Sequence, residues 1–274
     1  MFPAHLTFLA AANTAWFNMS TLATLVVSII SIAIVMFTTF HKKSRDKYKV
    51  RAIAGLRAVE DAIGRATEMA RPVLFTPGWG GDIQRPTTIA SLNILSHVAE
   101  KTASYDCQLI FPTHDPVIMA VAQEVVLGAY SAAGYPDRYR ADDITYVSSS
   151  QFGYAAAVDG LITRTKPASI FLLGTFEAES LILAETGNSI NAIQIAGTDS
   201  TIQLAFFIVA CDYSLIGEEL FAASGYLSGN PSILASVRAQ DIMKVLIAAA
   251  LVVAVVWATI QTISGHPLST WWVF

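Results

Sequence analysis

Residues 72–101 read PVLFTPGWGGDIQRPTTIASLNILSHVAEK and join a short apolar run to a helical pattern through a glycine-rich loop. Val73–Thr76 is a continuous run of the kind that forms a strand buried on both faces. Pro86, which suits the first position of a helix, opens a helical pattern that continues to about residue 103. A strand, a loop and a helix in this order predict one unit of a parallel sheet covered by helices.

The same alternation of short apolar runs and helical patterns continues on both sides of this unit. We predict a helix over about 52–71, which Pro72 ends. Further strands are predicted at 107–111, 144–148, 169–173, 192–196 and 202–211, and helices at about 116–133, 151–165, 176–186 and 214–226. The run 202–211 (IQLAFFIVAC) is too short to cross a membrane, and we interpret it as a central or late strand. The sequence therefore predicts a Rossmann-like three-layer α/β domain with a mostly parallel sheet over residues 52–241.

Charged residues are absent from both ends of the chain. Only 14% of the 274 residues are charged and 54% are hydrophobic, and neither 1–41 nor 245–274 contains Lys, Arg, Asp or Glu. The apolar segments 16–40 and 242–264 are each long enough to cross a hydrocarbon core, which takes about 20 helical residues. We therefore predict two transmembrane helices, with short tails at 1–15 and 265–274. High apolar content and only two cysteines exclude a disordered or disulfide-stapled chain.

Basic residues lie next to these segments on one side only. The segment 41–51 carries Lys42, Lys43, Arg45, Lys47, Lys49 and Arg51, and Arg238 and Lys244 lie just before and at the start of the second segment. By the positive-inside rule, the α/β domain is cytoplasmic and both termini are extracytoplasmic. The basic segment is expected to rest on anionic lipid headgroups at the membrane surface.

Apart from Lys244 at the start of the second segment, the two apolar segments contain no charge, so we interpret them as anchors and not as an ion or proton path. Small residues recur at helical spacing on both, namely Thr24, Ser28 and Ser31 on the first and Ala250, Ala254 and Ala258 on the second. Such rows either mark a helix-packing seam, within one chain or between chains, or reflect the ordinary composition of spanning helices.

Candidate ligand residues follow the predicted strands, because a parallel α/β sheet binds ligands at the carboxyl ends of its strands. The candidates are Gly78, Trp79, Gly80, Gly81, Thr175 and Thr198. A dinucleotide fingerprint would need a third glycine at position 83, which is Ile83. Trp79 is either a stacking platform or an interface anchor. The alternative for the hydroxyls and acids is helix capping, which suits Asp115 before Pro116 and also Ser150, Thr175 and Asp199.

Catalytic and metal sites have weaker candidates. His114 at a strand end, with Asp115 beside it, is the best acid/base pair. Four acids at strand ends, Glu177, Glu179, Asp199 and Asp212, are the candidates for a divalent cation. We nevertheless expect no metal and no cofactor. Residues 167–237 hold seven acids and no Lys or Arg, which disfavours nucleic acid as a partner.

The stretch from Arg51 to Glu100, with RAIAGLRAVEDAI, PVLFTPGWGGD and RPTTIASLNILSHVAE, resembles a group of bacterial membrane proteins known only by a domain of unknown function. In that group, spanning helices bracket a Rossmann-like region. The resemblance implies the same architecture and a place in the bacterial inner membrane, but no substrate and no catalytic residue.

Three hypotheses for function follow. The first is a membrane-anchored, non-enzymatic scaffold that self-assembles into a homo-oligomer. The second is a tethered α/β domain that binds, and in one form hydrolyses, a small molecule or nucleotide at the strand ends. The third is an accessory subunit packed against other membrane subunits.

Overall fold

The computed structural model describes residues 22–40, 54–229 and 231–263. The chain divides into two compact units, one of residues 48–237 and one made of 1–47 with 238–274. The first unit holds the α/β domain, and the second holds apolar helices from the two ends of the chain.

Six parallel strands form one sheet in the order β3-β2-β1-β4-β5-β6. They are β1 (Val73–Thr76), β2 (Leu109–Thr113), β3 (Ile144–Tyr146), β4 (Ser169–Leu173), β5 (Ile193–Thr198) and β6 (Tyr213–Ile216). This order is that of the doubly wound Rossmann sheet. The predicted α/β class and the mostly parallel sheet are confirmed.

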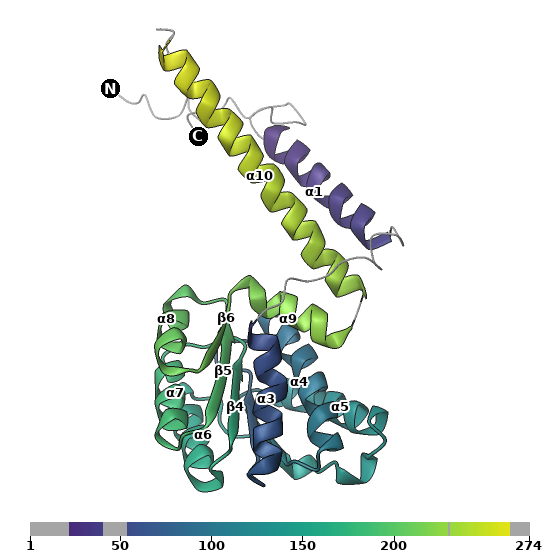
Figure 1. Cartoon of the computed structure of the whole chain (residues 1–274), viewed down its shortest axis with the longest axis vertical. Helices are drawn as coiled ribbons and strands as arrows, with labels where there is room; N and C mark the ends of the chain where they lie inside the picture. Colours follow the sequence, from purple (N-terminus) through teal and green to yellow (C-terminus); the bar gives the residue numbers. More distant parts are fainter. Residues whose placement is uncertain (1–21, 41–53, 230, 264–274) are drawn as a thin grey trace, which may run out of the picture. The chain divides into compact units, whose positions relative to one another are not determined.

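Helices cover both faces of this sheet (Figure 1). Those on one face are α3 (Ala54–Glu68), α4 (Pro86–Ser104), α5 (Pro116–Ala132) and α9 (Glu218–Ser228), and those on the other are α6 (Gln151–Thr165), α7 (Glu179–Ser189) and α8 (Thr201–Ala210). Two short 3-10 turns, η3 (Pro136–Arg138) and η4 (Ala141–Asp143), precede β3. The central strands β1, β2, β4 and β5 are buried on both faces, which is why these strands are mainly apolar.

The core on the α4 side is built around stacked phenylalanines. Phe75 of β1 stacks on Phe111 of β2 and Phe171 of β4, with ring centroids 5.9 and 5.8 Å apart. Leu74, one residue away, packs on the opposite face with helices α6 and α7. Successive side chains of a strand point to opposite faces, so this one short run anchors both layers of helices.

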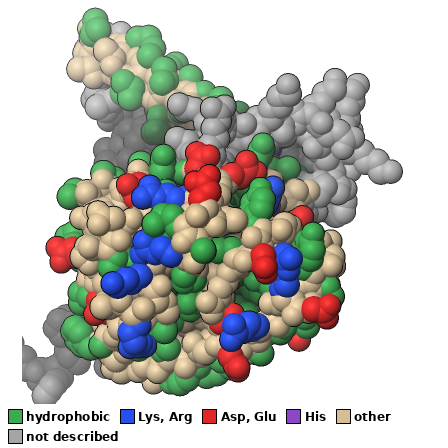
Figure 2. Space-filling view, turned by 60° about the horizontal axis from the view of Figure 1, so that its bottom comes forward, with side chains coloured by type: hydrophobic (Ala, Val, Ile, Leu, Met, Phe, Trp, Pro, Cys, Tyr) green, Lys and Arg blue, Asp and Glu red, His purple; other side chains and the backbone are tan. Residues whose placement is uncertain are grey.

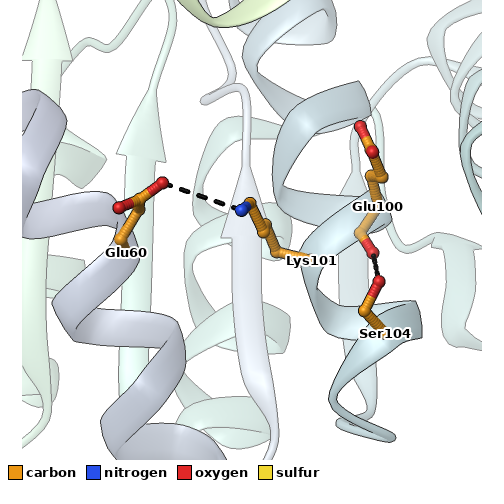
Figure 3. Close-up of polar contacts among 4 residues, drawn as sticks. All are labelled: Glu60, Glu100, Lys101 and Ser104. Carbon is orange, nitrogen blue, oxygen red and sulfur yellow. Dashed lines mark hydrogen bonds and ion pairs between the residues drawn. The ribbon is translucent and has the colours of Figure 1, made fainter. Parts of the chain in front are cut away.

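The outer side of α4 is polar and contacts α3. Lys101 Nζ lies 3.7 Å from Glu60 Oε1, and Ser104 Oγ donates to the backbone oxygen of Glu100 at 2.9 Å (Figure 3). The inner side buries residues from Thr87 to Ala103. This helix therefore has the division between apolar and polar faces expected for the surface of a domain.

The strand predicted at 202–211 is wrong, because residues Thr201–Ala210 form helix α8. The sixth strand is β6, and the helix predicted over 214–226 is in fact β6 followed by α9. The reason is topological: β5 and β6 are parallel neighbours, so the chain must return along the sheet between them. A ten-residue apolar run does not by itself distinguish a strand from a buried helix.

Other predicted boundaries move by a few residues. The predicted 107–111 and 192–196 strands lie at 109–113 and 193–198, and the helix predicted from 176 begins at Glu179. The strand predicted at 144–148 ends at Tyr146, so the loop before α6 begins earlier than predicted.

Helix α10 (Pro231–Ile263) contains the one helix among the described residues, Ile233–Ile263, that is long and apolar enough to cross a membrane. Helix α1 (Leu22–Phe40) offers only the shorter apolar run Thr24–Phe37. Of the two predicted spans, the structure therefore supports only the one near the C-terminus, since residues 16–21 of the other prediction lie outside the described residues.

Candidate functional site

The candidate site lies where β1 and β4 run side by side at the centre of the sheet. From β1 the chain moves to β2 on one side, whereas β4 leads to β5 on the other, so this is the topological switch point at which Rossmann folds bind ligands. Two loops meet there, residues 77–85 after β1 and residues 174–178 after β4. They carry Gly78, Trp79, Gly80, Gly81 and Thr175, so the structure brings together all but one of the predicted ligand residues.

The two loops are hydrogen-bonded to each other through their backbones. Gly80 N–H donates to the Thr175 oxygen at 3.0 Å, and Thr175 N–H donates to the Pro77 oxygen at 3.1 Å. A Cβ at Gly78 would lie 2.3 Å from the Thr175 oxygen, and one at Gly174 would lie 2.1 Å from the Pro77 oxygen. These glycines are needed because the two backbones touch, and the contact closes the space between the loops.

Gly81 is also in close contact, here with threonine hydroxyls. A Cβ at Gly81 would lie 2.5 Å from Thr88 Oγ1, and Thr87 Oγ1 lies 2.6 Å from Thr175 Oγ1. Thr88 Oγ1 and Ser91 Oγ, in the first turns of α4, are buried without a hydrogen-bond partner in the described part of the chain. The glycines thus face the protein's own side chains, where a phosphate-binding loop would face its ligand.

Glu179 is the centre of the polar contacts at this edge. Its carboxylate is buried, and Oε1 accepts from the backbone N–H groups of Trp79 and Glu177, both at 3.1 Å. Oε2 accepts from Gln151 Nε2 at 3.0 Å. The carboxylate at the start of α7 therefore ties the β1 loop to the start of α6. Hydrogen bonds from backbone N–H groups and the helix N-terminus stabilise its charge.

Three aromatic rings cover the end of β1. Trp79 donates from Nε1 to the Ser149 oxygen at 2.9 Å, and its ring centroid lies 5.9 Å from that of His114. The His114 ring meets Tyr154 edge-on at 6.0 Å, and the Tyr154 hydroxyl is hydrogen-bonded to Thr76 Oγ1. Trp79 thus contacts its own domain.

The protonation of these groups follows from burial. His114 Nδ1 lies 3.1 Å from the Gly78 oxygen, which can only accept, so Nδ1 carries the proton. Burial lowers the pKa of His114, and the Gly78 hydrogen bond and the charges of Asp115 and Glu179 oppose part of that shift. Burial raises the pKa of Tyr154. Both rings are therefore neutral near pH 7.

His114 and Asp115, the predicted acid/base candidates, have separate hydrogen-bond partners. Asp115 Oδ1 accepts from Val117 N–H at 2.6 Å and caps α5, with Pro116 in the first turn, as the capping alternative predicted. Ser150 occupies the N-cap position of α6 without a side-chain hydrogen bond. Thr175 and Asp199 are not caps, since α7 and α8 begin after Ala178 and Ser200.

The four acids considered for a cation do not come together. No three His, Cys, Asp or Glu side chains within the described ranges are placed to hold a metal ion. Asp212 precedes β6, and its Oδ2 accepts from Gln194 N–H at 2.8 Å, near the start of β5. It lies at the amino edge because the preceding run is a helix and not a strand. Thr198, on β5, is buried and accepts from Ser200 N–H outside the Glu179 contacts.

A model of the family DUF6754, described as a domain of unknown function, matches residues 12–268. The chain belongs to the DUF6754 family. This match confirms one part of the resemblance inferred from the sequence, namely that the chain contains a domain of unknown function. No curated protein and no solved structure matches the chain.

This DUF6754 protein has two cavities at the opposite, amino edge of the sheet. One of about 280 Å³ is lined by Asp106, Cys107, Gln108, Arg138 and Asp143, among others. Its polar groups are paired with one another, since Arg138 Nε lies 3.3 Å from Asp106 Oδ1 and Gln108 Nε2 donates to Asp143 Oδ1 at 2.7 Å. Figure 2 shows the molecule from this side, with Lys and Arg side chains interspersed with Asp and Glu.

Sequence reasoning missed Gln151 and Tyr154, which complete the contacts of Glu179 and His114. Both belong to α6 and do not directly follow a strand, which is where the sheet topology predicts ligand residues. The only sequence signal was that α6 begins immediately after the β3 loop. The amino-edge cavity was missed for the same reason.

The remaining predictions concern the other unit. The basic residues 42–51 lie outside the described residues. On α1, Ser28 and Ser31 donate to the backbone oxygens of Thr24 and Val27, both at 2.8 Å. Ala250, Ala254 and Ala258 lie on α10. Whether these rows form a packing seam stays a prediction.

Proposed function

We propose that this protein is a membrane-anchored scaffold without catalytic activity, which self-assembles into a homo-oligomer through its cytoplasmic α/β domain. The observation that carries this proposal is the closed switch point between β1 and β4. There Gly80 and Thr175 are joined backbone to backbone, and the Glu179 carboxylate is occupied by donors of the same chain.

The closed switch point argues against catalysis on a nucleotide at this edge. A Rossmann domain that binds a nucleotide leaves backbone N–H groups open at the end of β1. Here the Trp79 and Glu177 N–H groups bond Glu179, and the Gly80 N–H bonds Thr175. His114 donates to Gly78 and Asp115 caps α5. The chemical groups at this edge therefore stabilise the fold, which favours a structural role.

The membrane part of the proposal rests on α10 and on the distribution of charge. Ile233–Ile263 has the length and composition of a spanning helix. We further propose residues 16–40 as a second span, which makes the protein two-pass, with both termini extracytoplasmic in a bacterial inner membrane. Lys and Arg residues crowd into 42–51 and are absent from the ends, and this asymmetry supports that orientation.

Native mass spectrometry of the full chain, released from native membranes in lipid nanodiscs, tests the scaffold. We expect an integer multiple of 29.4 kDa with no added small molecule. A single copy under all conditions contradicts self-assembly. Foreign proteins in fixed stoichiometry would instead identify an accessory subunit of a larger membrane complex.

A second candidate function has one specific observation in its favour. Thr88 Oγ1, which lies against Gly81, and Ser91 Oγ further along α4 are buried without a hydrogen-bond partner among the described residues, which leaves two hydroxyls for a ligand if the loop opens. The function would then be binding of a nucleotide or a sugar. Melting of the full chain with ATP, AMP, glucose and Mg²⁺ tests it: a shift that Thr88→Val abolishes supports this candidate, and unchanged melting contradicts it.

A further inference from the structure

Helix α8 exposes an unusual amount of apolar surface for a helix that covers a sheet. Thr201–Ala210 has no charged residue, and only Phe207 is fully buried. Ile202, Phe206, Ile208 and Val209 are 71%, 38%, 54% and 88% exposed. By contrast, the exposed end of α4 carries Glu100 and Lys101. An outer face of this composition is typical of a surface that another molecule covers.

Four of the exposed residues of α8 form one stripe, and Ile208 lies to one side of it. Ile202, Ala205, Phe206 and Val209 are spaced at i, i+3, i+4 and i+7, so they lie on the same side of the helix, opposite the buried Phe207. The stripe is symmetric about its midpoint between Ala205 and Phe206. If two such helices pack antiparallel, Ile202 of one faces Val209 of the other, and the bulky Phe206 faces the small Ala205. The stripe is therefore complementary to itself.

The exposed area is sufficient for a stable contact. Ile216 of β6 is half-exposed and points to the same face of the sheet as α8, because its neighbour Leu215 points into the opposite core. With about 150 Å² for each side chain, the exposed parts of Ile202, Phe206, Ile208, Val209 and Ile216 together offer on the order of 450 Å². A standard interface buries about 800 Å² per partner, of which little more than half is apolar.

Charge argues against lipid as the covering surface. Helices that lie on membranes surround their apolar face with Lys and Arg, which contact anionic headgroups. Residues 167–237 contain no Lys or Arg, and Asp199 and Asp212 flank α8 at its two ends. An anionic bilayer would be repelled at this rim, whereas a protein partner would bury only the uncharged stripe.

We propose that the α8 face is the contact between two copies of this chain, packed about a two-fold axis with their α8 helices antiparallel. Two-fold contacts use the same patch on both copies, which requires the self-complementarity that the stripe has. Strand β6 supports this assignment, because it pairs with β5 on one side and with no described strand on the other. The inference rests on the proposed homo-oligomeric scaffold and names its contact surface.

Cross-linking of the full chain in native membranes tests the contact. In a background with Cys107→Ser and Cys211→Ser, Ala205→Cys places a thiol next to the two-fold axis. A bis-maleimide should then give a covalent dimer of twice 29.4 kDa, at least tenfold more abundant than with the matched control Ala120→Cys on α5, which is also exposed. Equal yields, no product, or a product of any other mass would overturn the proposal.

Placing a charged side chain on the stripe is a second test of the contact. Val209→Glu should lower the dimer population in native mass spectrometry at least tenfold, while Ala120→Glu leaves it unchanged. Because Val209 is 88% exposed, the melting temperature of the separated copies should stay the same. If the wild type is oligomeric but neither Ala205→Cys nor Val209→Glu behaves as expected, the α8 contact is wrong and the scaffold stands. If the wild type is a single copy, both proposals fail.

Discussion

At the carboxyl edge of β1 and β4, the loop backbones and the Glu179 carboxylate are hydrogen-bonded within the chain, whereas on the outer face of α8 large apolar side chains are exposed to solvent. The first region is where a Rossmann sheet leaves room for a ligand, and here glycines bring two backbones into contact. The second region lies on a helix whose composition is that of a protein interior. The edge loops find their hydrogen-bond partners within one chain, whereas the outer face of α8 is exposed.

This difference indicates where function should be sought. Side chains that pack or hydrogen-bond within the domain contribute to its stability, so replacing them lowers the free energy of unfolding. An exposed apolar surface becomes stabilising only when another molecule covers it. Substitutions at the edge and in the core should therefore change stability, and substitutions on the outside of α8 should change association alone.

The largest effect should come from the inner side of α8. Phe207 is fully buried and meets Phe176 edge-on at 5.1 Å, so Phe207→Ala should lower the free energy of unfolding by about 3–5 kcal/mol. Urea unfolding of the full chain in detergent, followed by circular dichroism, measures it. Val209→Ala on the outer side is the control, with a change within about 0.5 kcal/mol in separated copies. Similar losses for both variants would remove the distinction between the two sides.

The next effect concerns the closed edge. Gly174 has φ +149° and a Cβ there would lie 2.1 Å from the Pro77 oxygen, so Gly174→Ala must separate the two loops. We expect a loss of about 2–4 kcal/mol from strain and collision together. Gly217→Ala separates the two causes, because Gly217 also has a positive φ but no atom near its Cβ, and should cost about 1 kcal/mol. The same unfolding experiment applies. Equal losses at the two positions would mean that the loops are not in tight contact.

A smaller effect should appear as pH dependence. Burial lowers the pKa of both His114 and His97 below 6.5. The unfolded chain therefore binds protons more readily, so the contribution of these histidines is complete above pH 6.5 and is lost as the pH falls through their folded-state values. Unfolding between pH 5 and 8 should show this decline, and His114→Gln should flatten part of it. A chain that gains stability as the pH falls from 7 to 5.5 would contradict the assignment.

The smallest effect is expected at the polar outer side of α4. The Lys101–Glu60 contact is solvent-accessible, so Glu60→Gln should cost less than about 1 kcal/mol and less still at high salt. Glu100→Gln, on the same turn as Lys101, serves as the control for loss of a charge in Figure 3. A cost above about 2 kcal/mol would contradict the weak contribution expected of a solvent-accessible ion pair.

Part of the site was predictable from local patterns. Asp115 before Pro116 identifies a capped helix start, because the signal and its partner lie within two residues. The glycine loop and Thr175 were placed at one edge because parallel strands end together. That the loops would close on each other was not predictable, since the bond between Gly80 and Thr175 spans about 95 residues. The role of Glu179 needed Gln151 and Trp79, which lie far from it in sequence.

The sequence by itself determined that apolar strands alternate with helices, and it thereby determined a parallel α/β domain with apolar ends. Periodicity and proline placement suffice for this, because burial on both faces makes the central strands continuous apolar runs. Only the tertiary structure decided that 201–210 is a helix, that β6 follows it, and which side of α8 is uncovered. Those features depend on the return path from β5 to β6 and on contacts between distant segments, and an apolar run of ten residues satisfies either geometry equally well.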